Sequence, residues 1–257
     1  MTGVQTCALP IYAFEGIKSN EKQPLLNIII SSIYLYKGDF KNSEKFCRLA
    51  YEYNYSLTRS QSAFFDIIVD EKSILQHILN IAALTANKKL FNDFYDKLNN
   101  NEIEENWEKL FLFFNLLFNN KEIPQYLIKG LNVYLKNEYI DSILALLQVY
   151  QNISLRIEIL KVLEQKFTDK IGIYYLLADY YLNTGDVLSS VKYYQKFYEI
   201  DKTNPVVINQ LITIFFKLSM FRELSNLLNE AVVIFKDEPE IFDKLNKLKS
   251  KISDLIK

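Results

Sequence analysis

The feature that most restricts the fold is a helical hairpin pattern in residues 171–205, which carries its own start and stop signals. Its first half repeats apolar residues at i, i+3, i+4 and i+7, the spacing that places them on one face of a helix. Gly185 and Asp186 then indicate a turn, because glycine accepts the left-handed conformation at a helix C-terminus and aspartate caps the next helix. Pro205 marks a further helix start. The pattern predicts two antiparallel helices that need a packed neighbour, since short helices are marginal alone in water.

The same residue types return 34 residues later. This spacing (208 − 174 = 34) separates two sets of equivalent positions, Tyr174, Leu177, Ala178, Tyr181 and Phe197, then Ile208, Leu211, Ile212, Phe215 and Ala231. The unit resembles the tetratricopeptide repeat (TPR), a helix–turn–helix of 34 residues with the pattern W-x2-L-G-x2-Y, A-x3-F and P. Tyr174 takes the place of the tryptophan and Tyr181 matches the tyrosine, whereas Phe197 stands where a smaller residue is usual.

The resemblance implies an all-α fold, a right-handed α-solenoid of antiparallel helix pairs. It would be a TPR-like superhelix with a C-terminal capping helix. We expect one helical repeat domain over residues 12–257. Within it we expect the best repeats at 24–55, 171–204 and 205–238, degenerate pairs at 72–99, 101–136 and 137–167, and the capping helix at 239–257. Residues 56–71 hold phase with neither neighbour, and we expect a loop or a short extra helix there.

Residues 1–11, MTGVQTCALPI, resemble the translated adapter of a short-read sequencing library. We expect them to be non-native, so that the chain is a gene fragment without its native N-terminus. The alternative is a real short leader, although the segment lacks a basic region and a long apolar run. Without Cys7, Cys47 is the single cysteine and no intramolecular disulfide can form. We expect a cytoplasmic location, and a periplasmic one stays open because the native N-terminus is expected to be missing.

Composition excludes several classes of protein. The chain is 49% hydrophobic with only 6 Gly and 5 Pro, too few turn residues for an all-β domain. A formal net charge of −1 gives no electrostatic footprint for nucleic acid. The most apolar runs, 25–36 and 110–118, are shorter than the roughly 18 residues that a transmembrane helix needs. We therefore expect neither a nucleic-acid partner nor a transmembrane segment.

No set of residues in the sequence predicts an enzyme. His77 is the single histidine, so no two-histidine metal site exists and no Ser-His-Asp or Cys-His set can be argued. Glycine-rich phosphate loops are absent from the sequence. The adjacent tyrosine pairs, such as 174–175 and 193–194, are expected to place one ring in the core and the other elsewhere. We expect no catalytic residue, no cofactor and no metal.

The resemblance also implies a binding surface, because first helices of the repeats line the concave groove in this family. The groove-facing candidates are Asp141, Gln148, Tyr175, Asp179, Asn209 and Thr213. This strip is polar and mildly acidic, which suits an extended peptide with some basic character. A merely solvated face is the alternative. Tyr175 and Asn209 replace the lysines that clamp a C-terminal carboxylate in chaperone-binding members, so chaperone C-termini are disfavoured.

The expected function is therefore a non-enzymatic scaffold that binds a protein or an extended peptide of unknown identity in its concave groove. Two alternatives stay open. In the first, the chain is the C-terminal repeat region of a larger bacterial enzyme, such as a glycosyltransferase or kinase. In the second, it is a periplasmic or lipid-anchored assembly factor. The abundance of Ile, Lys, Asn and Tyr favours a low-GC bacterial source.

Overall fold

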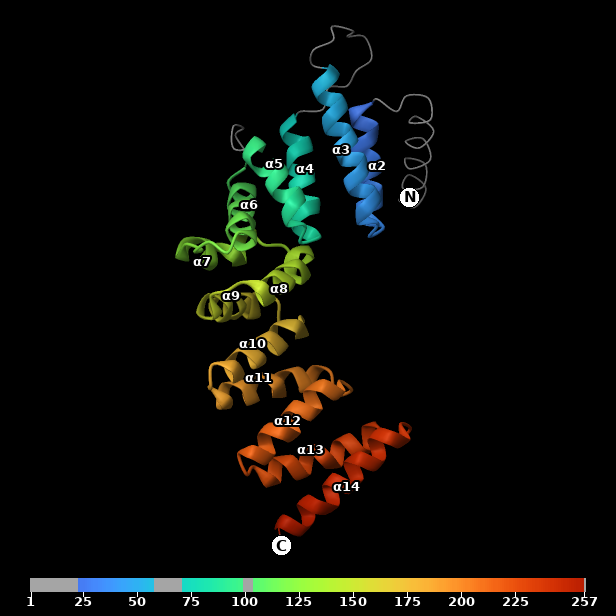
Figure 1. Cartoon of the computed structure of the whole chain (residues 1–257), viewed down its shortest axis with the longest axis vertical. Coiled ribbons are helices and arrows are strands. Elements are labelled where there is room, and N and C mark those ends of the chain that lie inside the picture. The colour runs from blue at the N-terminus through green and yellow to red at the C-terminus, as the bar shows by residue number, and fades with distance from the viewer. Residues whose placement is uncertain (1–22, 58–70, 99–103, 257) are drawn as a thin grey trace, which may run out of the picture. The chain divides into compact units, whose positions relative to one another are not determined.

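The computed structural model describes residues 23–57, 71–98 and 104–256, and every regular element in these ranges is a helix (Figure 1). The predicted all-α class is confirmed. The adapter-like residues 1–11 and most of the segment 56–71 lie outside the described residues.

The chain divides into two compact units, residues 1–150 and 151–257. The first unit contains α2 (Pro24–Tyr36), α3 (Phe40–Leu57), α4 (Glu71–Leu84), α5 (Lys88–Leu98), α6 (Glu105–Phe118), α7 (Gln125–Tyr134), the short 3-10 helix η1 (Asn137–Tyr139) and α8 (Ile140–Val149). The second contains α9 (Ile153–Lys166), α10 (Ile171–Asn183), α11 (Val187–Ile200), α12 (Pro205–Lys217), α13 (Phe221–Ile234) and α14 (Pro239–Ile256). From α9 to α14 each helix packs against the next, as in a helical solenoid.

The boundary between the units falls inside the range 137–167, which we expected to form one helix pair. Helix α8 packs against η1, α4 and α6, whereas α9 packs against α10. Each of the two helices therefore buries its apolar face within its own unit, and the sequence periodicity of α8 and α9 alone does not reveal this choice of neighbours.

The turn between α10 and α11 has the chemistry that the sequence predicts. Gly185 has φ of 84°, a conformation that side chains with a Cβ rarely adopt. The backbone N–H of Asp186 donates to the carbonyl of Tyr181 (2.9 Å), which satisfies a carbonyl at the end of α10. The Asp186 carboxylate accepts from the N–H of Ser189 (3.1 Å) and so caps α11. These local bonds set both helix boundaries.

Among the described residues, three other turns reach the same backbone conformation without glycine, one of them at Asn120 after α6, with φ of 50°. Ala86 lies between α4 and α5 with φ of 50°, and Ser219 lies between α12 and α13 with φ of 55°. The left-handed conformation costs a non-glycine residue about 1–2 kcal/mol. Packing of the flanking helices offsets that cost, so the turns occur where the sequence has no glycine signal.

Aromatic side chains fill the core of the first unit. Phe114 of α6 is fully buried, and its ring centroid lies 5.9 Å from that of Phe118 and 5.9 Å from that of Tyr139. The Tyr139 hydroxyl donates to Oδ1 of Asn80 on α4 (2.6 Å), so the polar end of this buried ring is satisfied. By contrast, Phe40, the first residue of α3, is 42% exposed.

A charged and aromatic cluster holds α9 to α11 in the second unit. The Glu164 carboxylate accepts a hydrogen bond from the Tyr193 hydroxyl (3.1 Å) and pairs with the Lys196 ammonium. The Tyr193 ring stacks on Tyr181 of α10, with centroids 5.6 Å apart and planes 4° from parallel. The Lys196 ammonium lies over the rings of Tyr174 and Tyr193, at 5.5 and 5.2 Å. The cluster therefore joins three consecutive helices.

Tyr193 and Tyr194 are both buried, which contradicts the expectation that one ring of each pair points away from the core. The reason is that α11 is covered by α10 on one side and α12 on another, while the cluster at Glu164 covers Tyr193. The solvated side of α11 carries Lys192, Gln195 and Glu199, and both tyrosine rings lie on the covered remainder of the helix.

Tyr194→Phe is expected to stabilise the second unit by about 1 kcal/mol. The Tyr194 hydroxyl is buried and has no hydrogen-bond partner among the described residues. Urea unfolding followed by circular dichroism tests this, and Tyr193→Phe is the matched control, which should destabilise because its hydroxyl is bonded to Glu164. A clear loss of stability in Tyr194→Phe would contradict the prediction.

Candidate functional site

The predicted binding residues of the second unit lie on α10 and α12. Tyr175 is half-buried, and its ring packs edge-to-face on Tyr194 (6.1 Å between centroids) and Phe197 (6.2 Å) of α11. Tyr175 therefore contributes to the packing of the α10–α11 pair. A substitution at this position would disturb the fold as well as any surface function.

Asp179 and Thr213 are engaged within their own helices. The Asp179 carboxylate accepts from Nδ2 of Asn183 (3.2 Å), one turn further along α10. The Thr213 hydroxyl donates to the carbonyl of Asn209 (2.8 Å) on α12. Burial raises the pKa of the Tyr194 hydroxyl, and the charge of the Asp179 carboxylate raises it further.

Asp141 and Gln148 are exposed on α8, which belongs to the first unit. The six predicted residues are thus divided between the two units, and four of them, Tyr175, Asp179, Asn209 and Thr213, share the second.

Asn209 lines an apolar pocket of about 210 Å³ between α12 and α14. Phe235, the residue that follows α13, also lines the pocket. Its other lining residues are Pro205, Ile208 and Ile212 from α12 and Ile241, Lys244, Leu245 and Leu248 from α14. Sequence reasoning missed this pocket because it assigned the apolar residues of the capping helix to covering the last repeat. Ile241, Leu248 and Ile212 are only half-buried, so these side chains keep apolar surface exposed.

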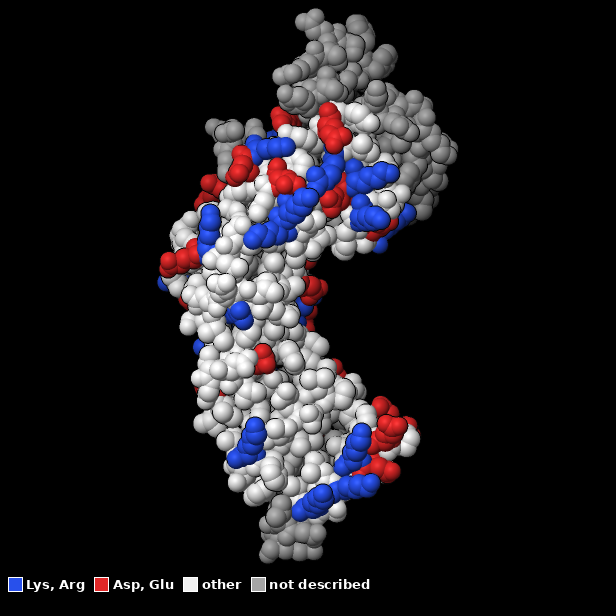
Figure 2. Space-filling model, in the orientation of Figure 1, with Lys and Arg blue, Asp and Glu red and all other residues white. Residues whose placement is uncertain are grey.

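The two helices that face each other across this pocket differ in charge. Residues 205–216 of α12 contain no charged side chain, whereas residues 244–253 of α14 contain four lysines and no carboxylate. Lysine side chains gather over α14 in the space-filling view (Figure 2). Lys244, Lys247 and Lys251 are exposed and recur at i, i+3 and i+7, which places them on one face of the helix. Lys244 thus forms a basic rim at the apolar pocket, and Lys247 and Lys251 continue this basic row along α14.

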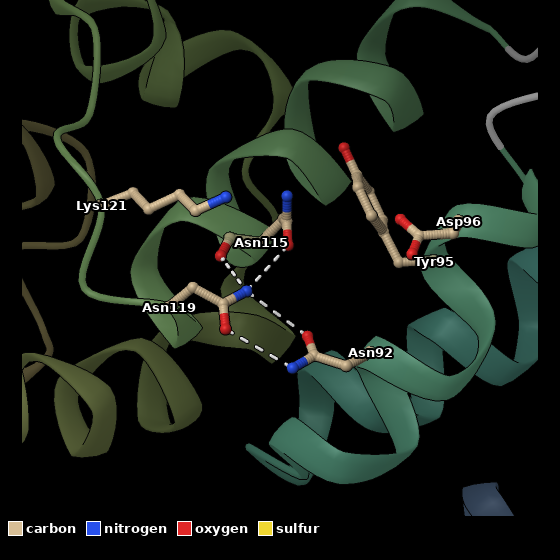
Figure 3. A pocket seen from close by; sticks show the side chains of 6 residues that line it. All are labelled: Asn92, Tyr95, Asp96, Asn115, Asn119 and Lys121. Atoms are coloured by element: carbon tan, nitrogen blue, oxygen red, sulfur yellow. Dashed lines mark hydrogen bonds between the residues drawn. The ribbon is translucent and has the colours of Figure 1, made fainter.

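A second cavity, of about 490 Å³, is polar and lies between α5 and α6 in the first unit. Asn92 and Asn119 face each other across it, and each carboxamide donates to the other at 3.4 Å (Figure 3). The Asn119 amide also donates to the side-chain oxygen of Asn115 (3.0 Å). Tyr95, Asp96 and Lys121 complete the lining. These side-chain amides mainly hydrogen-bond one another, and their hydrogen bonds link α5 to the C-terminal end of α6.

His77 lies in a buried polar network rather than in a catalytic set. The Ser31 hydroxyl donates to the Ser43 carbonyl (2.7 Å), and the Ser43 hydroxyl donates to the Ser31 carbonyl (2.8 Å). Nε2 of His77 is 3.2 Å from Oγ of Ser31, whose proton is already used, so the imidazole N–H is the donor. Burial raises the pKa of the nearby Cys47 thiol to about 12, which keeps it uncharged near neutral pH. Ser31 is fully buried, so the network fixes α2, α3 and α4.

The first unit is expected to lose stability as the pH falls below roughly 6.5, the pKa of an unperturbed histidine. Burial lowers the pKa of His77 in the folded chain, so the unfolded chain binds the proton more readily and is favoured in acid. Urea unfolding at pH 7.5 and pH 5.5 measures the loss, and His77→Gln should reduce the difference between the two pH values. An unchanged difference in His77→Gln would contradict this assignment.

Within residues 23–57, 71–98 and 104–256, no three His, Cys, Asp or Glu side chains are grouped so that they could hold a metal ion. In the same ranges, no helix combines the length and the hydropathy required to cross a bilayer.

The packed helix pairs and their glycine turns define a helical-repeat protein. Two of the pairs also match the tetratricopeptide repeat family, in residues 26–56 and 171–204. Residues 26–56 and 171–204 are therefore two tetratricopeptide-like repeats. The pair α12–α13 lies outside both matched segments, and its turn has Ser219 where the matched pair α10–α11 has Gly185. A comparison with curated proteins finds no match for the chain.

Proposed function

We propose that the chain is a non-enzymatic scaffold that binds an extended protein segment on the second unit, at the surface formed by α12 and α14. Tetratricopeptide repeats commonly serve as surfaces for protein interactions. The observation that carries the proposal is the apolar pocket beside Asn209, because half-buried Ile212, Ile241 and Leu248 would lose further contact with water if an apolar side chain entered. Asn209 supplies a carboxamide at the edge of the pocket, suited to a peptide backbone.

The volume of the pocket suits one apolar side chain of a partner. Ligand pockets for whole small molecules are typically about 300–1,000 Å³, and this one is about 210 Å³. A partner segment would therefore place an anchoring residue in the pocket and lie along the neighbouring helix faces. This arrangement requires no reaction chemistry, in keeping with a binding role.

The test is a selection of random displayed peptides on the full chain, followed by affinity measurements on Ile212→Glu. Burying an unpaired carboxylate in the pocket is costly, so we expect at least a roughly tenfold loss of affinity for the selected peptides. Val233→Glu is the matched control, because Val233 is 69% exposed on α13 and does not line the pocket. The proposal is wrong if no peptide is enriched, or if both variants bind the selected peptides as the parent chain does.

A further inference from the structure

We propose that the segment bound at this pocket is acidic, with carboxylates placed beside the apolar residue that enters the pocket. The inference rests on the proposed function and specifies the chemistry of the partner. It differs from the sequence expectation of a partner with basic character, which depends on carboxylates such as Asp141 and Asp179. Asp179 is already bonded to Asn183, and Asp141 lies in the first unit.

Three exposed lysines form a row on α14 beside the pocket. Lys244 lines the pocket itself, and Lys247 and Lys251 continue along the same face of α14. All three side chains are exposed, so their ammonium groups are open to a partner. A segment with its apolar side chain in the pocket would pass next to this row.

The ammonium groups of these three lysines are not engaged in ion pairs in the described residues. No salt bridge joins Lys244, Lys247 or Lys251 to a carboxylate in the part of the chain that the structure describes. Glu240 and Asp243 stand one helical turn before Lys244 and Lys247 but form no salt bridge with them, and α12 offers no carboxylate across the pocket. A partner's carboxylates would therefore meet a basic rim with no competing acid on the facing helix.

Helix α14 carries its apolar and its basic side chains on adjoining sides. Ile241, Leu245 and Leu248 occupy the side of α14 that faces α12, and the three lysines occupy the adjoining side. Such a surface is complementary to a segment that is apolar on one side and acidic on the next. Charge complementarity of this kind selects partners and speeds their association, and salt weakens it.

The test uses the peptides that the random selection enriches on the full chain. We expect them to combine a bulky apolar residue with neighbouring Asp or Glu, and to bind about tenfold more weakly to the triple variant Lys244→Glu, Lys247→Glu and Lys251→Glu. The control is a second triple variant, Lys192→Glu, Lys217→Glu and Lys236→Glu. It changes the net charge equally at exposed positions of the second unit that do not line the pocket. Circular dichroism verifies that both variants are folded.

The outcomes separate this inference from the proposed function. Neutral or basic peptides that lose affinity in Ile212→Glu but not in the Lys244 triple variant would overturn the acidic partner and leave the pocket as a binding site. Equal losses in both triple variants would also overturn it, because the effect would then follow net charge alone. Peptides made with a free or an amidated C-terminus distinguish the source of the carboxylate: weaker binding of the amidated form assigns the contact to the chain terminus, equal binding assigns it to acidic side chains, and tighter binding of the amidated form would contradict the acidic ligand.

Discussion

Phe114→Ala is expected to lower the free energy of unfolding of the first unit by about 3–5 kcal/mol, the usual range for removing a buried phenylalanine ring. Phe114 is fully buried and contacts aromatic rings of three elements, with centroids 6.4 Å from Phe91, 6.0 Å from Phe113 and 5.9 Å from Tyr139. Its loss would leave a cavity where α5, α6 and η1 meet, and such a rigid aromatic cluster collapses only partly.

Trp107 provides the measurement, because it is the only tryptophan of the chain and lies on α6 of the same unit. Its ring centroid is 5.3 Å from that of Phe111, so its fluorescence should follow unfolding of this core in urea. Phe40→Ala is the matched control, since Phe40 is 42% exposed in the first unit and should change stability by less than about 1 kcal/mol. Similar losses in the two variants would show that Phe114 is not a centre of the core.

Glu164→Ala is expected to destabilise the second unit by about 2 kcal/mol. The Glu164 side chain is 18% exposed and accepts hydrogen bonds from both Tyr193 and Lys196, which would lose their shared acceptor. Lys196 is 37% exposed, so solvent compensates part of the loss and keeps it below the cost of breaking a fully buried pair.

Glu230 offers a matched control within the same unit. It accepts from the Tyr198 hydroxyl (3.2 Å) and pairs with Lys202 (3.3 Å), the same chemistry as Glu164. Its side chain is 52% exposed, so Glu230→Ala should cost less than about 1 kcal/mol. Urea unfolding followed by circular dichroism compares the two variants. A Glu230→Ala effect as large as that of Glu164→Ala would mean that burial does not set the strength of these pairs.

Local sequence signals predicted the helix pairs where a turn residue has one strong physical requirement. Gly185 takes positive φ at the turn that the sequence predicts, and Asn204 caps α12 at its predicted start before Pro205. Ala86 and Ser219 adopt the same conformation at turns for which no glycine signals it. At these two positions only the flanking helices make the backbone geometry predictable.

The candidate site was predictable only in part. The helical period and the family resemblance drew attention to Asn209, which does line the pocket. The same reasoning selected Tyr175, but its ring packs against α11. A helical period indicates the direction in which a side chain points, and it does not indicate which neighbouring helix covers that side chain. The lysines of α14 are plain in the sequence, yet their proximity to an apolar pocket depends on where α12 lies.

The sequence by itself determined the all-α class, the repeat of 34 residues and the main turns, because these depend on interactions between residues close in the chain. Tertiary structure decided which neighbour each helix chose. It assigned α8 and α9 to different units, buried both Tyr193 and Tyr194, and left a pocket between α12 and α14. The physical reason is that packing depends on the shapes of side chains from separate repeats, which meet only when the helices are assembled.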